Sequence, residues 1–197
     1  MLRHAARAVP WPLLAVTAAL LALLLRIVAE WPYTMWPLEG IAVGLLAGVA
    51  GFAYDEPAAA IVDTLPRGLA WRTAARSIGV TLLVAWWLGA VSVTRDAYFG
   101  HAPDVAFQGV VAVLAVLAAA AHLRLRGHDS PATLLATGVV GAAAYLSLAR
   151  PIEDVLVVFP YTEVGEWASS RTWWSALGAG ALVVLGLALG ERGTAES

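Results

Sequence analysis

The sequence predicts an all-α membrane protein, a single bundle of six membrane-spanning helices that occupies residues 1–197. Two observations predict it: 60% of the 197 residues are hydrophobic and only 13% are charged, which is about half the charged share of a soluble domain. The mean hydropathy of +0.76 agrees with this. Because a globular protein of this size keeps much of its surface in water, so apolar a chain is expected to have hydrocarbon as its solvent.

Six stretches have the character that a membrane-crossing helix needs, which is a run of roughly 20 mainly apolar residues. The second and third are short for a full crossing, and we expect them to extend into their flanks. The predicted spans are residues 12–29, 38–54, 78–93, 105–123, 131–148 and 173–190.

The arginines predict the orientation, since the cytoplasmic loops of membrane proteins carry an excess of positive charge. All twelve basic side chains are arginine. With the amino terminus inside, eight of them fall on the cytoplasmic side and four on the other side or at the adjoining membrane depth. The eight are Arg3, Arg7, Arg67, Arg72, Arg76, Arg124, Arg126 and Arg192, and the four are Arg26, Arg95, Arg150 and Arg171. We therefore expect a multi-pass protein of a bacterial cell membrane, with both termini in the cytoplasm.

The connection between the second and third spans, residues 55–76, is predicted to form a helix, an elbow and a second helix at the cytoplasmic membrane surface. Asp55 and Pro57 suit the start of a helix, and the sequence LPRG at residues 65–68 breaks it. From Leu69 to Arg76, apolar residues alternate with arginines, as in interfacial helices. The alternative is a solvated loop whose arginines only fix the topology.

The connection between the fifth and sixth spans, residues 150–172, is too apolar for an ordinary exposed loop. One apolar run ends at Pro160, and a second, weaker run includes Val164, Trp167 and Ala168. Neither is long enough to cross a bilayer. A pair of short re-entrant or interfacial helices on the outer side is the prediction, because such backbone is tolerated where protein or a cavity covers it. A compact lid without a role in transport is the alternative.

The layout of these elements resembles that of a known family. Six spans, an amphipathic elbow after the second and an apolar hairpin after the fifth are similar to the permease subunits of exporter-like bacterial ABC transporters. The stretch DEPAAAIVDTLPRGLAWRTAARS, residues 55–77, resembles the cytoplasmic loop of the actinobacterial members. The resemblance covers nearly the whole chain in layout, and only this loop in residue detail.

The resemblance implies a coupling elbow that docks on a separate ABC ATPase subunit. Its candidate residues are Asp63, Arg67, Trp71, Arg72 and Arg76. Arginine can bind a partner's carboxylates in a bidentate manner, and binding of anionic lipid headgroups is the competing use. The chain has no G-x-x-x-x-G-K-[ST] phosphate loop. ATP and Mg²⁺ are therefore expected in the ATPase partner, with no cofactor in this chain, and a second, unlike permease subunit is a further expected partner.

Glycines recur at four-residue spacing in the second span, at Gly40, Gly44 and Gly48. They fall on one helical face and allow another helix to approach closely. Packing within the chain is the favoured interpretation, and an interface with a second subunit across the transport path is the alternative.

Charged and aromatic residues near the outer ends of the spans are candidates for a substrate vestibule. They are Arg26, Glu30, Glu39, Phe159 and Trp167. Charges at membrane depth pair with one another or face a cavity. For Arg26, a structural ion pair with Glu30 one turn later is the favoured role.

Several classes of function lack their sequence signals. The chain has no cysteine and no catalytic motif, and no dense basic patch for nucleic acid. His4, His101, His122 and His128 form no ligand pair on one helical face. With these signals missing, the resemblance implies a non-enzymatic transport subunit. The tryptophans near the outer end and the few charges in the spans favour a hydrophobic or amphipathic substrate. A membrane anchor of a redox complex and a non-transporting protein of envelope assembly are the alternatives.

Overall fold

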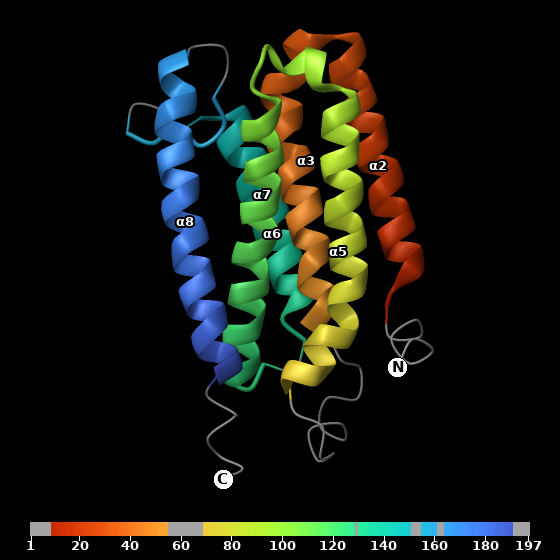
Figure 1. Ribbon diagram of the computed structural model, residues 1–197, viewed down its shortest axis with the longest axis vertical. Helices are drawn as coiled ribbons and strands as arrows, with labels where there is room; N and C mark the ends of the chain where they lie inside the picture. The colour runs from red at the N-terminus through yellow and green to blue at the C-terminus, as the bar shows by residue number, and fades with distance from the viewer. Residues whose placement is uncertain (1–8, 55–68, 129, 151–154, 161–163, 191–197) are drawn as a thin grey trace.

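The computed structural model describes residues 9–54, 69–128, 130–150, 155–160 and 164–190. In these ranges the chain is all-α, and six long helices stand side by side with alternating direction (Figure 1). In chain order they are α2 (Trp11–Glu30), α3 (Met35–Ala50), α5 (Leu69–Val93), α6 (Ala102–Leu125), α7 (Ala132–Leu148) and α8 (Val164–Gly190). The short 3₁₀ helices η1 (Pro32–Thr34), η2 (Gly51–Tyr54) and η3 (Arg95–Tyr98) lie between them.

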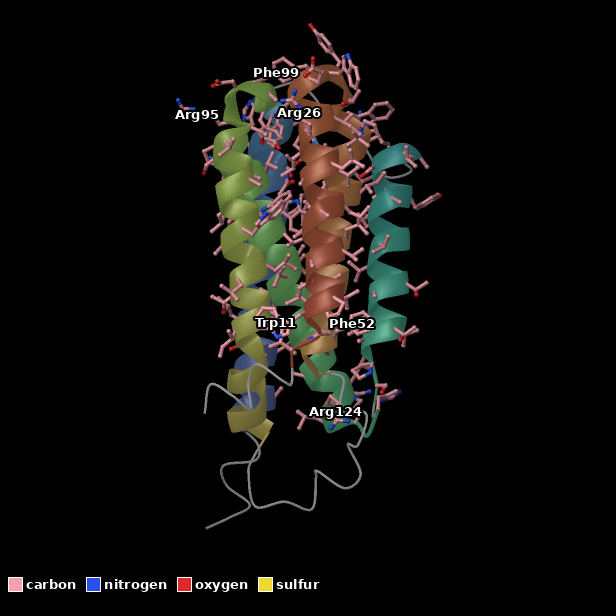
Figure 2. The ribbon with its side chains drawn as sticks, turned by 90° about the vertical axis from the view of Figure 1, so that its right-hand side faces the viewer. Trp11, Arg26, Phe52, Arg95, Phe99 and Arg124 are labelled. Carbon is pink, nitrogen blue, oxygen red and sulfur yellow. The ribbon has the colours of Figure 1, made fainter. Side chains whose placement is uncertain are left out.

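The start of α2 and the end of α8 lie at the same end of the bundle, drawn at the bottom of Figure 1. We call this the lower end, and the opposite end the upper end. Figure 2 shows Arg26, Arg95 and Phe99 at the upper end and Arg124 at the lower end. The connections α2–α3 and α5–α6 are at the upper end, and the α6–α7 connection is at the lower end.

Four helical segments are long and apolar enough to cross a membrane: Trp11–Glu30, Pro32–Ala50, Ala102–Leu125 and Gly165–Ala188. The apolar segments Ser77–Val93 and Ala132–Leu148 are shorter. At a rise of about 1.5 Å per residue, the α7 helix is about 26 Å long, slightly less than the roughly 30 Å of a bilayer's hydrocarbon core. The described residues confirm the predicted all-α fold class, and apolar helices of this length are compatible with a membrane protein.

Two close helix pairs organise the bundle: α3 packs on α7, and α6 packs on α8. The helices α3 and α6 also contact each other and form the centre of the bundle, while α2 and α8 expose most of their surface. Large apolar side chains on α8 point away from the protein, among them Leu182, Val183 and Leu187. Such a surface is suited to hydrocarbon rather than to water.

Small residues explain why α3 and α7 approach so closely. A Cβ atom added at Gly44 would lie 2.7 Å from the Cβ of Ala143, and one at Gly48 would lie 3.3 Å from the Cα of Ala136. A Cβ at Gly40 would collide with the Oγ of Ser147. The glycines predicted from their spacing therefore face another helix of the same chain, as in the small-residue interfaces of membrane helices.

The centre of the core is the fully buried Trp87 of α5. Its indole Nε1 donates a hydrogen bond of 3.4 Å to the carbonyl oxygen of Ala106. Its ring lies against Gly109 of α6, where a side chain would collide with it. A large ring on one helix thus fills the space that a missing side chain leaves on the next.

The predicted elbow differs from the structure in its second half. Residues 69–76 were expected as a separate surface helix, but α5 runs from Leu69 to Val93 without a break. Gly68 is the last helix-breaking residue before the span, and the residues that follow it are mostly good helix formers. The first half of the elbow, including Asp63 and Arg67, lies outside the described residues.

The predicted hairpin of two short helices is also not what the structure describes. Residues 155–160 contain a turn and bends rather than a helix, and the residues from Val164 onward are the first turns of α8. The run contains three valines and ends at Pro160, and both residue types disfavour helix. Of the predicted connector, residues 151–154 and 161–163 lie outside the described residues.

Candidate functional site

The strongest polar contact of the described chain joins α6 to α8 at the upper end. The guanidinium of Arg171 on α8 donates hydrogen bonds to both carboxylate oxygens of Asp104. Its Nε is 2.7 Å from Oδ1, and its Nη2 is 3.0 Å from Oδ2. Asp104 is in the first turn of α6, where the helix dipole also favours a negative charge. Its side chain is 12% exposed and that of Arg171 is 60% exposed. The pair therefore lies at the border between the bundle interior and its surroundings.

His101 holds Asp104 from the other side. This residue precedes the first turn of α6, and its Nδ1 is 3.3 Å from the second carboxylate oxygen of Asp104. The imidazole ring is stacked on the indole of Trp167, with ring centroids 4.3 Å apart and parallel planes. Trp167 is buried in α8. Asp104 is thus held by two side chains, Arg171 and His101, and His101 is itself held by the ring of Trp167.

A second set of polar contacts anchors the irregular segment at residues 155–160. Gln108 of α6 donates a hydrogen bond of 3.3 Å to the Oγ of Ser170, which in turn donates to the carbonyl oxygen of Val158 at 2.9 Å. The indole Nε1 of Trp174 donates to the same carbonyl at 2.9 Å. The carbonyl oxygen of Val158 has no helical hydrogen bond, and two side chains of α8 supply its donors instead. A backbone polar group needs such partners where water is excluded.

Glu39 is the most isolated charged residue of this region. It lies in the second turn of α3, is 3% exposed, and neither carboxylate oxygen has a hydrogen-bond partner among the described residues. Acidic side chains are almost never fully buried unless they are paired. In a membrane protein, a buried and unpaired acidic residue is a candidate for a functional role rather than a purely structural one.

An apolar groove of about 480 Å³ opens on the side of the bundle between α7 and α8. Ala142 and Leu146 of α7 form one wall, and Ala176 and Leu177 of α8 form the other. Val43 and Ala112 belong to its floor on α3 and α6, and Phe159 of the irregular segment lies at its upper end. Each of its lining residues is apolar. Its volume is within the range of small-molecule sites.

The five residues predicted for an outer vestibule all lie toward the upper end, but they do not face one space. Arg26 and Glu30 form an ion pair of 3.1 Å on the exposed side of α2. Glu39, Phe159 and Trp167 are buried. Phe159 borders the apolar groove, whereas Arg26 borders a separate hollow between α2 and α5. The ion pair expected for Arg26 is present, and the single vestibule is not found in the described residues.

Of the coupling candidates, Trp71, Arg72 and Arg76 are in the first two turns of α5 at the lower end. Their use as a docking site stays a prediction. Among the described residues, no group of three or more histidine and acidic side chains is placed to hold a metal ion.

The sequence reasoning missed the members of the polar cluster that link α6 to α8. They are Asp104, Gln108, Ser170 and Arg171. One signal was present, because Gln108 is an uncharged polar residue in the otherwise apolar stretch from Val105 to Ala121. Another was the helical spacing of Trp167, Ser170 and Trp174, which form one buried face of α8.

Comparison with known protein families, with curated proteins and with solved structures finds no match for this chain. The likeness to ABC permease subunits therefore rests on the layout of the helices and on the loop residues alone.

Proposed function

We propose that this chain is the transmembrane subunit of a bacterial ABC-type transport complex that moves an amphipathic, lipid-like substrate. All six helices cross the cell membrane, with the lower end and both termini in the cytoplasm. A separate ATPase subunit supplies ATP hydrolysis, and a second permease subunit completes the pathway. The observation that carries the proposal is the apolar groove between α7 and α8, which opens sideways toward the surrounding hydrocarbon.

The occupant of the groove is one hydrocarbon chain of the substrate. Its walls are hydrophobic, and the indole N–H of Trp174 is already bound to the carbonyl oxygen of Val158. An apolar chain therefore loses nothing by entering, whereas a polar group would lose its hydration. Polar residues are near its upper end: Ser170 binds the backbone of Val158, and Arg171 binds Asp104. A molecule with an apolar tail and a polar head would match an apolar groove that has polar residues near its upper end.

The lower end is the side on which the ATPase docks. The first turns of α5 carry Arg72 and Arg76 and continue directly into the membrane helix. A continuous helix can transmit a displacement at its cytoplasmic end along its length, and arginines suit the carboxylates of a partner protein. This support is independent of the groove.

Filling the groove tests the proposal. Ala176 lines the groove on the exposed side of α8, so Ala176→Trp places a large ring in it without entering the core. We expect binding of a phosphatidylcholine with a fluorescent acyl chain to weaken at least tenfold, in detergent-solubilised protein.

The matched control is Ala179→Trp, since Ala179 is also exposed on α8 but does not line the groove. This variant is expected to bind the same lipid within about twofold of wild type. Equal binding by both variants and wild type would show that the groove is not the lipid site. Purification from cells that express the whole operon, with no ATPase bound, would count against the transport complex itself.

A further inference from the structure

Glu39 is buried without the compensation that an ionised carboxylate needs. Its residue is 3% exposed, and among the described residues neither oxygen accepts a hydrogen bond. An isolated carboxylate in an apolar medium is so unfavourable that the group takes up a proton instead. The geometry of the carboxyl group therefore favours its neutral form, whatever the function of the protein.

The nearest acidic neighbour makes a negative charge at Glu39 still less favourable. Asp104 is within electrostatic range of Glu39, and its own charge is already balanced by Arg171 and approached by His101. A negative charge at Glu39 would be repelled by the carboxylate of Asp104. Burial and this repulsion act in the same direction, and both favour the protonated form of Glu39.

Within the described ranges, the other titratable groups discussed for the upper end are exposed or engaged with partners. The buried Tyr98 of η3 shares a hydrogen bond of 3.1 Å with Thr94. Burial raises the pKa of Tyr98 to about 12. The other charged groups that the structure describes at this end are the exposed pairs Arg26–Glu30 and Arg95–Asp96, and Arg150, which lies 4.0 Å from Glu166.

Further buried polar atoms without a hydrogen-bond partner in the described part of the chain include the Oγ of Ser147 on α7 and the Oε1 of Gln108 on α6. Ser147 packs beside Gly40, the residue that follows Glu39. Orphaned atoms of this kind are rare in native proteins. Their presence in the upper parts of α6 and α7, the two helices that pack on α3, identifies this level of the bundle as a polar site within an apolar interior.

We propose that Glu39 is a proton-binding site that carries one exchangeable proton in the conformation described here. Release breaks the O–H bond and passes the proton to water or hydroxide, which leaves a carboxylate on α3. A carboxylate there adds a second negative charge in electrostatic range of Asp104, the residue that binds Arg171. Protonation of Glu39 is thereby linked to the contact that joins α6 to α8, and the protein has a means of coupling a conformational change to a proton.

Infrared spectroscopy of the isolated protein in lipid nanodiscs tests the site. The wild type at pH 7 should show the carbonyl stretching band of a protonated carboxylic acid, which shifts in D₂O and with ¹³C-labelled glutamate. In Glu39→Gln this band is expected to disappear while the fold is retained, because glutamine is a neutral side chain of the same size. Isotope labelling assigns the band to a glutamate rather than an aspartate without any substitution, so the test survives a variant that fails to fold. Among the glutamates that the structure describes, Glu39 alone is buried.

The control is Glu30→Gln on the neighbouring helix α2. Glu30 is exposed and paired with Arg26, so this variant should keep the band unchanged. A wild-type spectrum without the band at pH 7 would overturn the proposal, including the case in which Na⁺ occupies the site of an ionised Glu39. A band that persists in Glu39→Gln would overturn it as well. Loss of the ATPase partner would contradict the proposed function alone, since this measurement uses the chain by itself.

Discussion

The Gly44→Leu protein is expected to be less stable than wild type by about 3 kcal/mol or more, the upper range for an overpacked interface. The added side chain would meet the Cβ of Ala143 at 2.7 Å and the backbone of Val140 at 3.4 Å. Neither neighbour can turn away, because one is a Cβ atom and the other belongs to the backbone of α7. Thermal unfolding in detergent, followed by circular dichroism, measures the loss.

Gly141→Leu is the matched control for this experiment. Gly141 is in α7, and a Cβ atom added there meets nothing within 4 Å. Replacement of glycine in an exposed helical position costs nothing in packing and gains helix propensity of up to about 1 kcal/mol. If the two variants unfolded at the same temperature, the close packing of α3 on α7 would be wrong, and the glycines would be free to face a second subunit.

Truncation of Trp87 to alanine is expected to cost about 3–5 kcal/mol, as is typical for a large aromatic residue in a core. The side chain is fully buried between α5 and α6, and its hydrogen bond to Ala106 is lost together with the ring. The cavity that remains cannot collapse easily, because Gly109 opposite has no side chain to fill it. The same unfolding assay measures the effect.

Trp86→Ala provides the comparison, since Trp86 is the adjacent residue and is only partly buried at the core's edge. We expect it to lose less than half as much stability as Trp87→Ala. If Trp86→Ala lost as much stability as Trp87→Ala, or more, then α5 would turn a different face toward the core than the one described here.

The sequence predicted the number and approximate place of the helices because apolar runs of this length have few alternatives in a membrane protein. It was less informative about where two of them begin. For α5, the arginines at positions 72 and 76 favour a surface helix by their charge, but arginine is also a good helix former, and the membrane helix continues through them. For α8, the polar residues between Val164 and Thr172 concealed a buried helical face.

The contacts of the upper polar site were beyond sequence reasoning for a simple reason. Asp104 and Arg171 are 67 residues apart, and Gln108 and Ser170 are 62 apart. Only the docking of α8 on α6 brings them together, and no local pattern encodes that docking. Glu39 was noticed as a charge at membrane depth, but its isolation depends on which neighbours fill the space around it. Periodicity does not specify those neighbours.

Cysteine labelling tests the arrangement of the six helices across the membrane most directly, because the chain has no cysteine of its own to react. Asp96 is fully exposed between α5 and α6 at the upper end, and Arg126 is exposed at the end of α6 at the lower end. In intact cells, a membrane-impermeant maleimide is expected to label Asp96→Cys and to label Arg126→Cys only after the membrane is permeabilised. Labelling of Arg126→Cys in intact cells would contradict the proposed topology, and with it the placement of the groove and of Glu39 relative to a cytoplasmic ATPase.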